Sequence, residues 1–127
     1  MSDTFRLQGA YSSTPLMGSP SGQPTVSAPV DETCQIINQQ IAQYTLASDA
    51  NVAVGFGGCE SVNVLVVKAI GAAVLVEIDY VGDGSYQSVK VDSFLSLICL
   101  SEAILAIRIS RLDTIETSVR LFLGQYG

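Results

Sequence analysis

Apolar and polar residues alternate with a period of two along much of the chain beyond residue 30, which is the pattern of half-buried β-strands. Within residues 74–80, apolar side chains at even positions alternate with Glu77 and Asp79. Within residues 88–92, Val89 and Val91 alternate with polar residues. Both segments are predicted to be strands with one face toward a core, and Glu77 and Asp79 are expected to face solvent.

The sequence Gly82-Asp83-Gly84-Ser85 lies between these two segments. Asp-Gly between alternating segments is a strong signal for a two-residue β-hairpin turn. With Asp83 and Gly84 as the turn, apolar residues pair with apolar residues and an acid pairs with a base. The predicted register joins Ile78 to Val89, Val76 to Val91, and Glu77 to Lys90.

Further apolar segments indicate more strands at regular spacing. Two of them, 62–69 and 103–110, are nearly continuous apolar runs, which suit strands covered on both faces. The others are 41–47, 52–56 and 115–123, whereas 94–100 fits either a strand or a short buried helix. About eight short strands at this spacing predict a sandwich or barrel. We expect an all-β fold, with residues 31–127 forming one jelly-roll-like antiparallel β-sandwich.

The first 30 residues differ in composition from the rest. From Gly9 to Pro29, 14 of 21 residues are Gly, Pro, Ser or Thr, and all four prolines of the chain lie there. Proline lacks the amide donor and fixes φ, which disfavours helices and central strands. Residues 1–30 are therefore predicted to be an extended arm with little internal hydrogen bonding, ordered mainly by another chain. Its expected anchors on a partner are Phe5, Leu7, Tyr11, Leu16 and Met17.

The composition narrows the classes of partner. Charged residues make up only 14% of the chain, against about 25% in ordinary soluble domains, which suits a subunit that buries surface against neighbours. The net charge of −6 disfavours nucleic acid and anionic membranes as partners. The apolar stretches 62–78 and 94–109 are interrupted by charges and shorter than the roughly 20 residues of a membrane span. The N-terminus has no apolar core of signal-peptide length, so we expect synthesis in a cytoplasm.

Three cysteines, Cys34, Cys59 and Cys99, are widely spaced along the chain. An odd number in apolar surroundings predicts reduced thiols, at least two of them buried, in a protein from a reducing compartment. One disulfide plus one free thiol is the alternative.

The residues that would carry catalysis are sparse. The absence of histidine excludes triads with a histidine base and histidine-ligated zinc. Cys59 follows the glycine-rich segment 55–58, which we interpret as a turn requiring positive φ, with Cys59 a small buried residue after it. Asp79 and Asp83 resemble part of a calcium loop, but position 81 is valine. A glycosidase-like carboxylate pair has no favoured candidates. We therefore predict no enzymatic activity, metal or cofactor.

The succession of a 62–69 strand, an Asp-Gly turn, Val89–Asp92 and a closing 119–123 strand resembles small accessory proteins of tailed-phage virions. These include capsid cement or decoration proteins with a jelly-roll-like sandwich and an N-terminal arm, and the resemblance extends over residues 36–124 and the arm. It implies location on the virion, made in the host cytoplasm, with the major capsid protein or another virion protein as partner and homo-oligomers. Two alternatives are a tail, neck or fibre component and a carbohydrate- or receptor-binding sandwich that uses Tyr80, Tyr86 and Tyr126.

Overall fold

The computed structural model describes residues 3–13 and 26–126, which fold entirely into strands, turns and loops. Within this part of the chain, no helix has the length and apolarity required to cross a membrane. The strands are β1 (Asp3–Ser13), β2 (Val26–Leu46), β3 (Val52–Ala53), β4 (Val64–Ile70), β5 (Val74–Asp79), β6 (Gln87–Val91), β7 (Phe94–Leu97), β8 (Ala106–Arg111) and β9 (Thr117–Tyr126).

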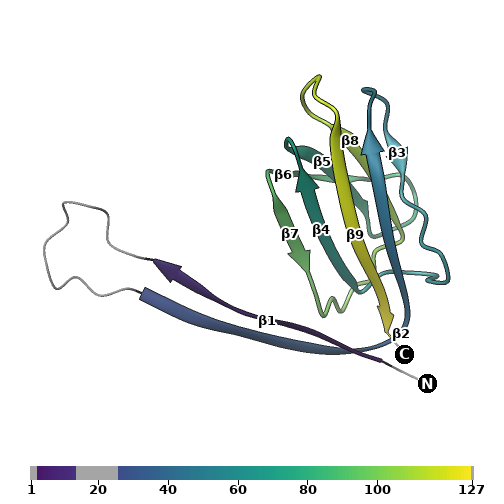
Figure 1. Cartoon of the computed structure of the whole chain (residues 1–127). Helices are drawn as coiled ribbons and strands as arrows, with labels where there is room; N and C mark the ends of the chain where they lie inside the picture. The colour runs from purple at the N-terminus through teal and green to yellow at the C-terminus, as the bar shows by residue number, and fades with distance from the viewer. Residues whose placement is uncertain (1–2, 14–25, 127) are drawn as a thin grey trace, which may run out of the picture.

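The strands form two antiparallel sheets that pack as a sandwich (Figure 1). The five-stranded sheet has the order β1-β2-β9-β4-β7, and the four-stranded sheet has the order β3-β8-β5-β6. Four antiparallel pairs are nested along the chain, as in one long hairpin folded over itself: β2–β9, β3–β8, β4–β7 and β5–β6. The pairs β9–β4 and β8–β5 then join these into two sheets. This is the jelly-roll arrangement, which confirms the predicted fold class.

The main core lies between the two sheets, where alternate residues of the strands meet. Val74, Val76 and Ile78 of β5 are buried there, as the period-two pattern predicts. The ambiguous segment after residue 93 is a strand, β7, over Phe94–Leu97. The prediction of strands from apolar alternation is thus confirmed, although β3 is only two residues long.

The β5–β6 hairpin exists, but its predicted register is wrong. Val76 pairs with Val89 and Ile78 with Gln87, two residues from the expected alignment. The connection is a loop rather than a two-residue turn because the Asp79 side chain organises it. Asp79 Oδ1 accepts hydrogen bonds from the amides of Val81 (2.9 Å) and Gly82 (2.8 Å), and Oδ2 accepts one from Gly84 (2.9 Å). Asp79 is 2% exposed, which corrects the expectation that it faces solvent.

A β-bulge in β2 changes the side of the sheet that its buried residues face. The pairing of β2 with β9 shifts between Ile36 and Asn38. Before the shift, Cys34 and Ile36 pack in a second cluster with Val64, on the outer face of the sheet. After it, Leu46 packs in the main core. The extra residue, Ile37, therefore places even-numbered residues on the outer face before the bulge and on the core face after it.

Candidate assembly site

The predicted arm is a two-stranded ribbon, here called the N-terminal ribbon, of residues 3–13 and 26–36. Its strands pair without interruption from Asp3–Ile36 to Ser13–Val26. The ribbon extends away from the sandwich (Figure 1), and β2 runs through residue 30 without a break. Little internal hydrogen bonding was expected, and this is wrong, because the antiparallel ladder satisfies backbone groups on both strands. Pro29 is compatible with β2 because a strand of a two-stranded ribbon has an open edge.

The predicted anchor residues are divided between the described and undescribed parts of the chain. Phe5 is half-buried and its ring stacks on Phe122 of β9, with centroids 5.1 Å apart. Leu7 is also half-buried. Tyr11 pairs with Ala28 in the outer half of the ribbon, and its side chain lies outside the described residues, as do Leu16 and Met17. The ribbon is therefore attached at its base through Phe5.

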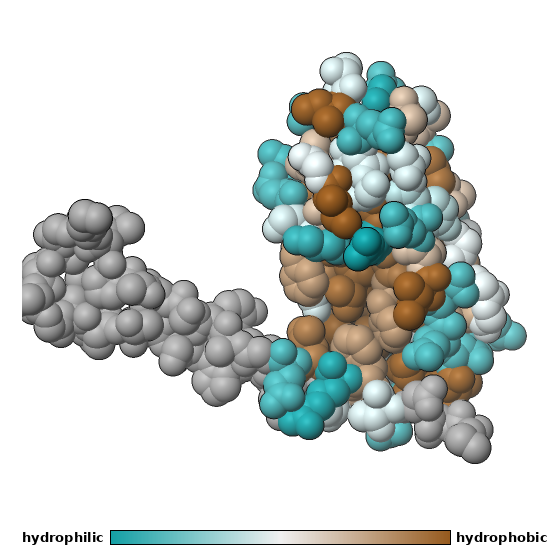
Figure 2. Space-filling view, viewed as in Figure 1, coloured by the Kyte–Doolittle hydropathy of each residue, from teal (hydrophilic) through white to brown (hydrophobic). Residues whose placement is uncertain are grey.

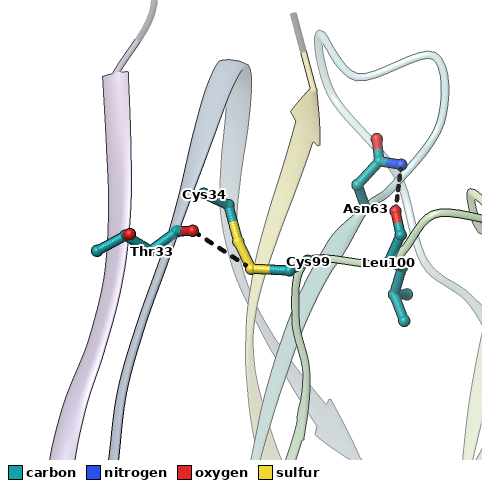
Figure 3. Close-up of a disulfide and its surroundings, with 5 residues drawn as sticks. All are labelled: Thr33, Cys34, Asn63, Cys99 and Leu100. Carbon is teal, nitrogen blue, oxygen red and sulfur yellow. Dashed lines mark hydrogen bonds between the residues drawn. A yellow bond between two sulfur atoms is a disulfide. The ribbon is translucent and has the colours of Figure 1, made fainter.

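A disulfide between Cys34 and Cys99 strengthens this base (Figure 3). Cys99 follows β7, which is separated from β2 by β9 and β4, a spacing of about 14 Å in a flat sheet. The Cα atoms of the two cysteines are nevertheless 5.8 Å apart. The sheet and the segment after β7 must therefore curl toward each other over the outer face of β9 and β4.

The disulfide shows that the prediction of three reduced thiols is wrong for Cys34 and Cys99, and that the alternative of one disulfide plus one free thiol holds. Two buried cysteines were expected, and Cys34 and Cys59 are buried. Cys99 Sγ lies 3.5 Å from the Thr33 carbonyl oxygen, along the dashed line of Figure 3. This contact is a hydrogen bond only in the reduced form, because a disulfide sulfur carries no proton.

Asn63 is a buried residue that the sequence analysis did not identify as important. Its Nδ2 donates to the Leu100 carbonyl (3.1 Å), as Figure 3 shows, and its Oδ1 accepts from the Tyr126 amide (3.0 Å). The Asn63 side chain thus joins the segment after Cys99 to the end of β9. A single amide at the start of the apolar run 62–69 was the only sequence signal, because a buried amide requires partners.

The outer face of the four-stranded sheet carries a compact charged group. Arg108 of β8 donates to Glu77 of β5 at 2.8 Å and lies 4.0 Å from the centre of the Tyr86 ring. The hydrogen bond to Glu77 raises the pKa of the Arg108 guanidinium above its ordinary value. Glu77 was expected to pair with Lys90, and this is wrong because the actual register places Arg108 directly opposite it. Glu77 therefore does pair with a base on a neighbouring strand, but that base is Arg108 of β8 and not Lys90 of β6.

Cys59 has the surroundings of a structural residue. Its amide donates to the Phe56 carbonyl across a turn in which Gly57 has a φ of 61°, as predicted for this glycine segment. Burial raises the pKa of the Cys59 thiol, which keeps it protonated and a weak nucleophile. Among the residues described, no group of three or more His, Cys, Asp or Glu side chains is arranged to hold a metal ion.

Comparisons with known proteins show no relative of this chain. No protein-family model, curated protein or solved structure matches the chain.

Proposed function

We propose that this protein is a virion structural protein that acts as a capsid cement, bridging neighbouring subunits of an outer shell. The observation that carries the proposal is the N-terminal ribbon. A two-stranded hairpin is at best marginally stable alone in water, and this one extends away from the sandwich, with the packing of its described side chains at the base. Such an element gains stability from a neighbouring surface, which is what an assembly clamp requires.

The mechanism is mechanical. The jelly roll provides a rigid body, the Cys34–Cys99 disulfide and Phe5–Phe122 stacking fix the root of the ribbon, and the ribbon lies along an adjacent capsid subunit. Each contact is weak, but many copies bound on one symmetric shell act together through effective concentration. The sandwich is acidic and has few charged residues, and it carries the N-terminal ribbon. These features suit a partner that is itself a protein of the shell, either the major capsid protein or another virion protein.

Deletion of residues 1–30 tests this function. None of the described side chains of this segment belongs to the main core, so the truncated sandwich should remain folded. It should bind purified empty capsids of the encoding virus much more weakly than the full chain in co-sedimentation, and should raise their thermal stability less. Equal binding by the truncated and full chains contradicts the clamp. Binding of the full chain to isolated tails instead of capsids supports the alternative of a tail, neck or fibre component.

A carbohydrate-binding role receives less support from the described residues. Jelly rolls also occur in lectins, which stack sugars on exposed aromatic rings. Tyr80 is half-buried against the main core, the Tyr86 ring is occupied by Arg108, and Tyr126 packs in the cluster of Cys34 and Ile36. Each of the three tyrosines that were candidates for a sugar platform therefore already has a packing role.

A further inference from the structure

Two basic side chains face each other on the outside of the five-stranded sheet. Lys68 of β4 lies directly opposite Arg120 of β9, and both are exposed. Like charges directly opposite each other destabilise a sheet. Neither side chain has an ion pair among the described residues, although acids outnumber bases twelve to six in the chain. The pair therefore has a cost to the isolated subunit that an external carboxylate would remove.

Apolar side chains lie on two sides of this pair, while exposed Gln43 of β2 lies beside Arg120 on a third. Phe94 of β7 lies directly opposite Lys68, and one register step away the outer face carries Ile41, Phe122 and Val66 in a row. Ile41 is 75% exposed and Phe94 is 54% exposed. Figure 2 looks onto this sheet and shows apolar surface gathered over its lower part, with hydrophilic surface above. We call these six residues the cationic face: Ile41, Val66, Lys68, Phe94, Arg120 and Phe122.

A loop at one end of the sandwich has the opposite character. Residues 112–116, here called the acidic loop, join β8 to β9 and expose Leu112 and Ile115 beside Asp113 and Glu116. Ile115 is 55% exposed. Neither acid has an ion pair among the described residues. The acidic loop therefore presents two carboxylates and two apolar side chains, and the cationic face presents two cations among apolar side chains.

The acidic loop is held in shape by side chains at its two ends. Arg111 donates to the Thr114 carbonyl (3.4 Å) and to Asp49 (2.9 Å), and Thr117 Oγ1 donates to the Ile115 carbonyl (3.1 Å). Thr117 is fully buried. A loop fixed in this way loses little conformational entropy on binding, which favours its use as a contact surface.

We propose that the acidic loop of one copy docks on the cationic face of a second copy. The cationic face cannot pack on itself about a two-fold axis, since that would oppose four unpaired cations. Loop-to-face contact pairs opposite charges and covers apolar surface on both sides. Because the two surfaces differ, the contact is head-to-tail and generates a closed ring or an open chain. This inference deepens the assembly role proposed above and rests on it for its biological setting.

Sedimentation velocity of the full-length protein tests the contact without any capsid. We expect the sedimentation coefficient of the wild type to rise with protein concentration, more so at low than at high ionic strength. Lys68→Glu should weaken self-association by about tenfold, because it replaces an attraction to the acidic loop with a repulsion. The matched control is Lys90→Glu, which makes the same charge change on β6 and should leave association within about twofold of wild type.

A charge exchange completes the test. Glu116→Lys alone should also associate weakly. An equimolar mixture of Lys68→Glu and Glu116→Lys proteins should associate within about threefold of wild type. In the mixture, the lysine-bearing loop of one variant meets the glutamate-bearing face of the other, and the unchanged loop meets the unchanged face. Monomeric wild-type protein at every concentration overturns the proposal, as do equal effects of Lys68→Glu and Lys90→Glu or a mixture that fails to recover. If the wild-type protein self-associates but does not bind capsids, that result would contradict the proposed cement function and leave the loop-to-face contact standing.

Discussion

Phe5 of β1 and Phe122 of β9 stack at 5.1 Å although β2 lies between their strands in the sheet. Adjacent strands are about 4.8 Å apart, so rings two strands apart meet only where the sheet curls strongly. Cys34, which pairs with Phe5 across β1 and β2, is buried at the same place. The base of the ribbon is thus part of a second small core, separate from the one between the sheets.

Phe5→Ala should release the base of the ribbon while leaving the sandwich folded. A half-buried aromatic in a stacked pair contributes about 1–2 kcal/mol, and that loss falls on β1 rather than on the main core. Hydrogen exchange of the β1 amides should accelerate, with β4 and β9 amides much less affected. Phe94→Ala, which removes an exposed ring on β7, is the control and should leave β1 exchange unchanged. Unaltered β1 protection in Phe5→Ala would show that the ring does not hold the ribbon.

Lys68→Glu should stabilise the isolated subunit, the reverse of the usual effect of a surface substitution. A glutamate opposite Arg120 replaces a like-charge pair with an opposite-charge one, worth about 0.2–1 kcal/mol. Urea denaturation of dilute, monomeric protein at low salt should show a raised midpoint. Lys90→Glu should lower the midpoint slightly or not at all, since it removes an exposed pair with Asp92. A lowered midpoint in Lys68→Glu would contradict the assignment of an unrelieved cation pair.

Asp79→Asn should destabilise the protein in a pH-dependent way. The backbone hydrogen bond from Gly82, with those from Gly84 and Val81, lowers the pKa of Asp79 below its ordinary value of 3.8 in spite of the opposing effect of desolvation. A carboxyl with a lowered folded-state pKa adds stability that is complete above the ordinary value and is lost as pH falls through the folded value. The gap between wild type and Asp79→Asn in chemical denaturation should therefore be largest near neutral pH and narrow in acid.

The comparison variant for Asp79 is Asp83→Asn in the same loop. Asp83 accepts one exposed hydrogen bond, from Ser85, so its replacement should cost much less at neutral pH. A gap between wild type and Asp79→Asn that stays constant from neutral to acid pH would exclude the charge of Asp79 as the source of its effect.

Reduction of the Cys34–Cys99 disulfide should lower the free energy of unfolding by about 4 kcal/mol, the chain-entropy value for a loop of this length. Guanidinium denaturation with and without a reductant measures it, and the Cys34→Ser/Cys99→Ser protein should match the reduced wild type. Cys59→Ala should retain the full difference between oxidised and reduced forms, because Cys59 is a free thiol. Equal stability of oxidised and reduced wild type would mean that the bond adds nothing to the fold.

The fold was predictable because its information is local and periodic. Alternation at Val74, Val76 and Ile78 identified β5, and the same signal in 115–123 identified β9 within a few residues. The hairpin register was not predictable, since the Asp-Gly signal competed with Asp79, whose carboxylate gathers three amides only once the chain bends there. The turn preferences of the residues at the turn do not include hydrogen bonds to a side chain that precedes it, such as Asp79.

The candidate site was predictable only in outline. Composition marked residues 1–30 as distinct and named Phe5 among five anchors on a partner, but it predicted neither the pairing with the beginning of β2 nor the stacking of Phe5 on Phe122 of the same chain. Proline-rich composition disfavours strands on average. The Cys34–Cys99 bond joins residues 65 apart in sequence, and no spacing rule connects them. The cationic face depends on which residues of β4 and β9 lie side by side, and this follows from register rather than from either strand alone.

Ile37 adds one residue to β2 relative to β9, and so shifts by one the alternation of side chains between the two faces of the sheet. Even-numbered residues are the buried ones on both sides of it, yet they serve the ribbon cluster before the bulge and the main core after it. In a regular strand, residues ten positions apart face the same side, so it is the bulge that puts Ile36 and Leu46 on opposite faces of the sheet. Removing Ile37 would leave Ile36 opposite Tyr126 and Asn38 opposite Gln125 as consecutive regular pairs, with Cys34 still toward Cys99 and Leu46 still in the core. A one-residue deletion between Asn38 and Leu46, with the bulge kept, would instead turn one of these two buried side chains to the wrong face. β2 should therefore tolerate the loss of a residue at the bulge far better than the loss of one further along the strand.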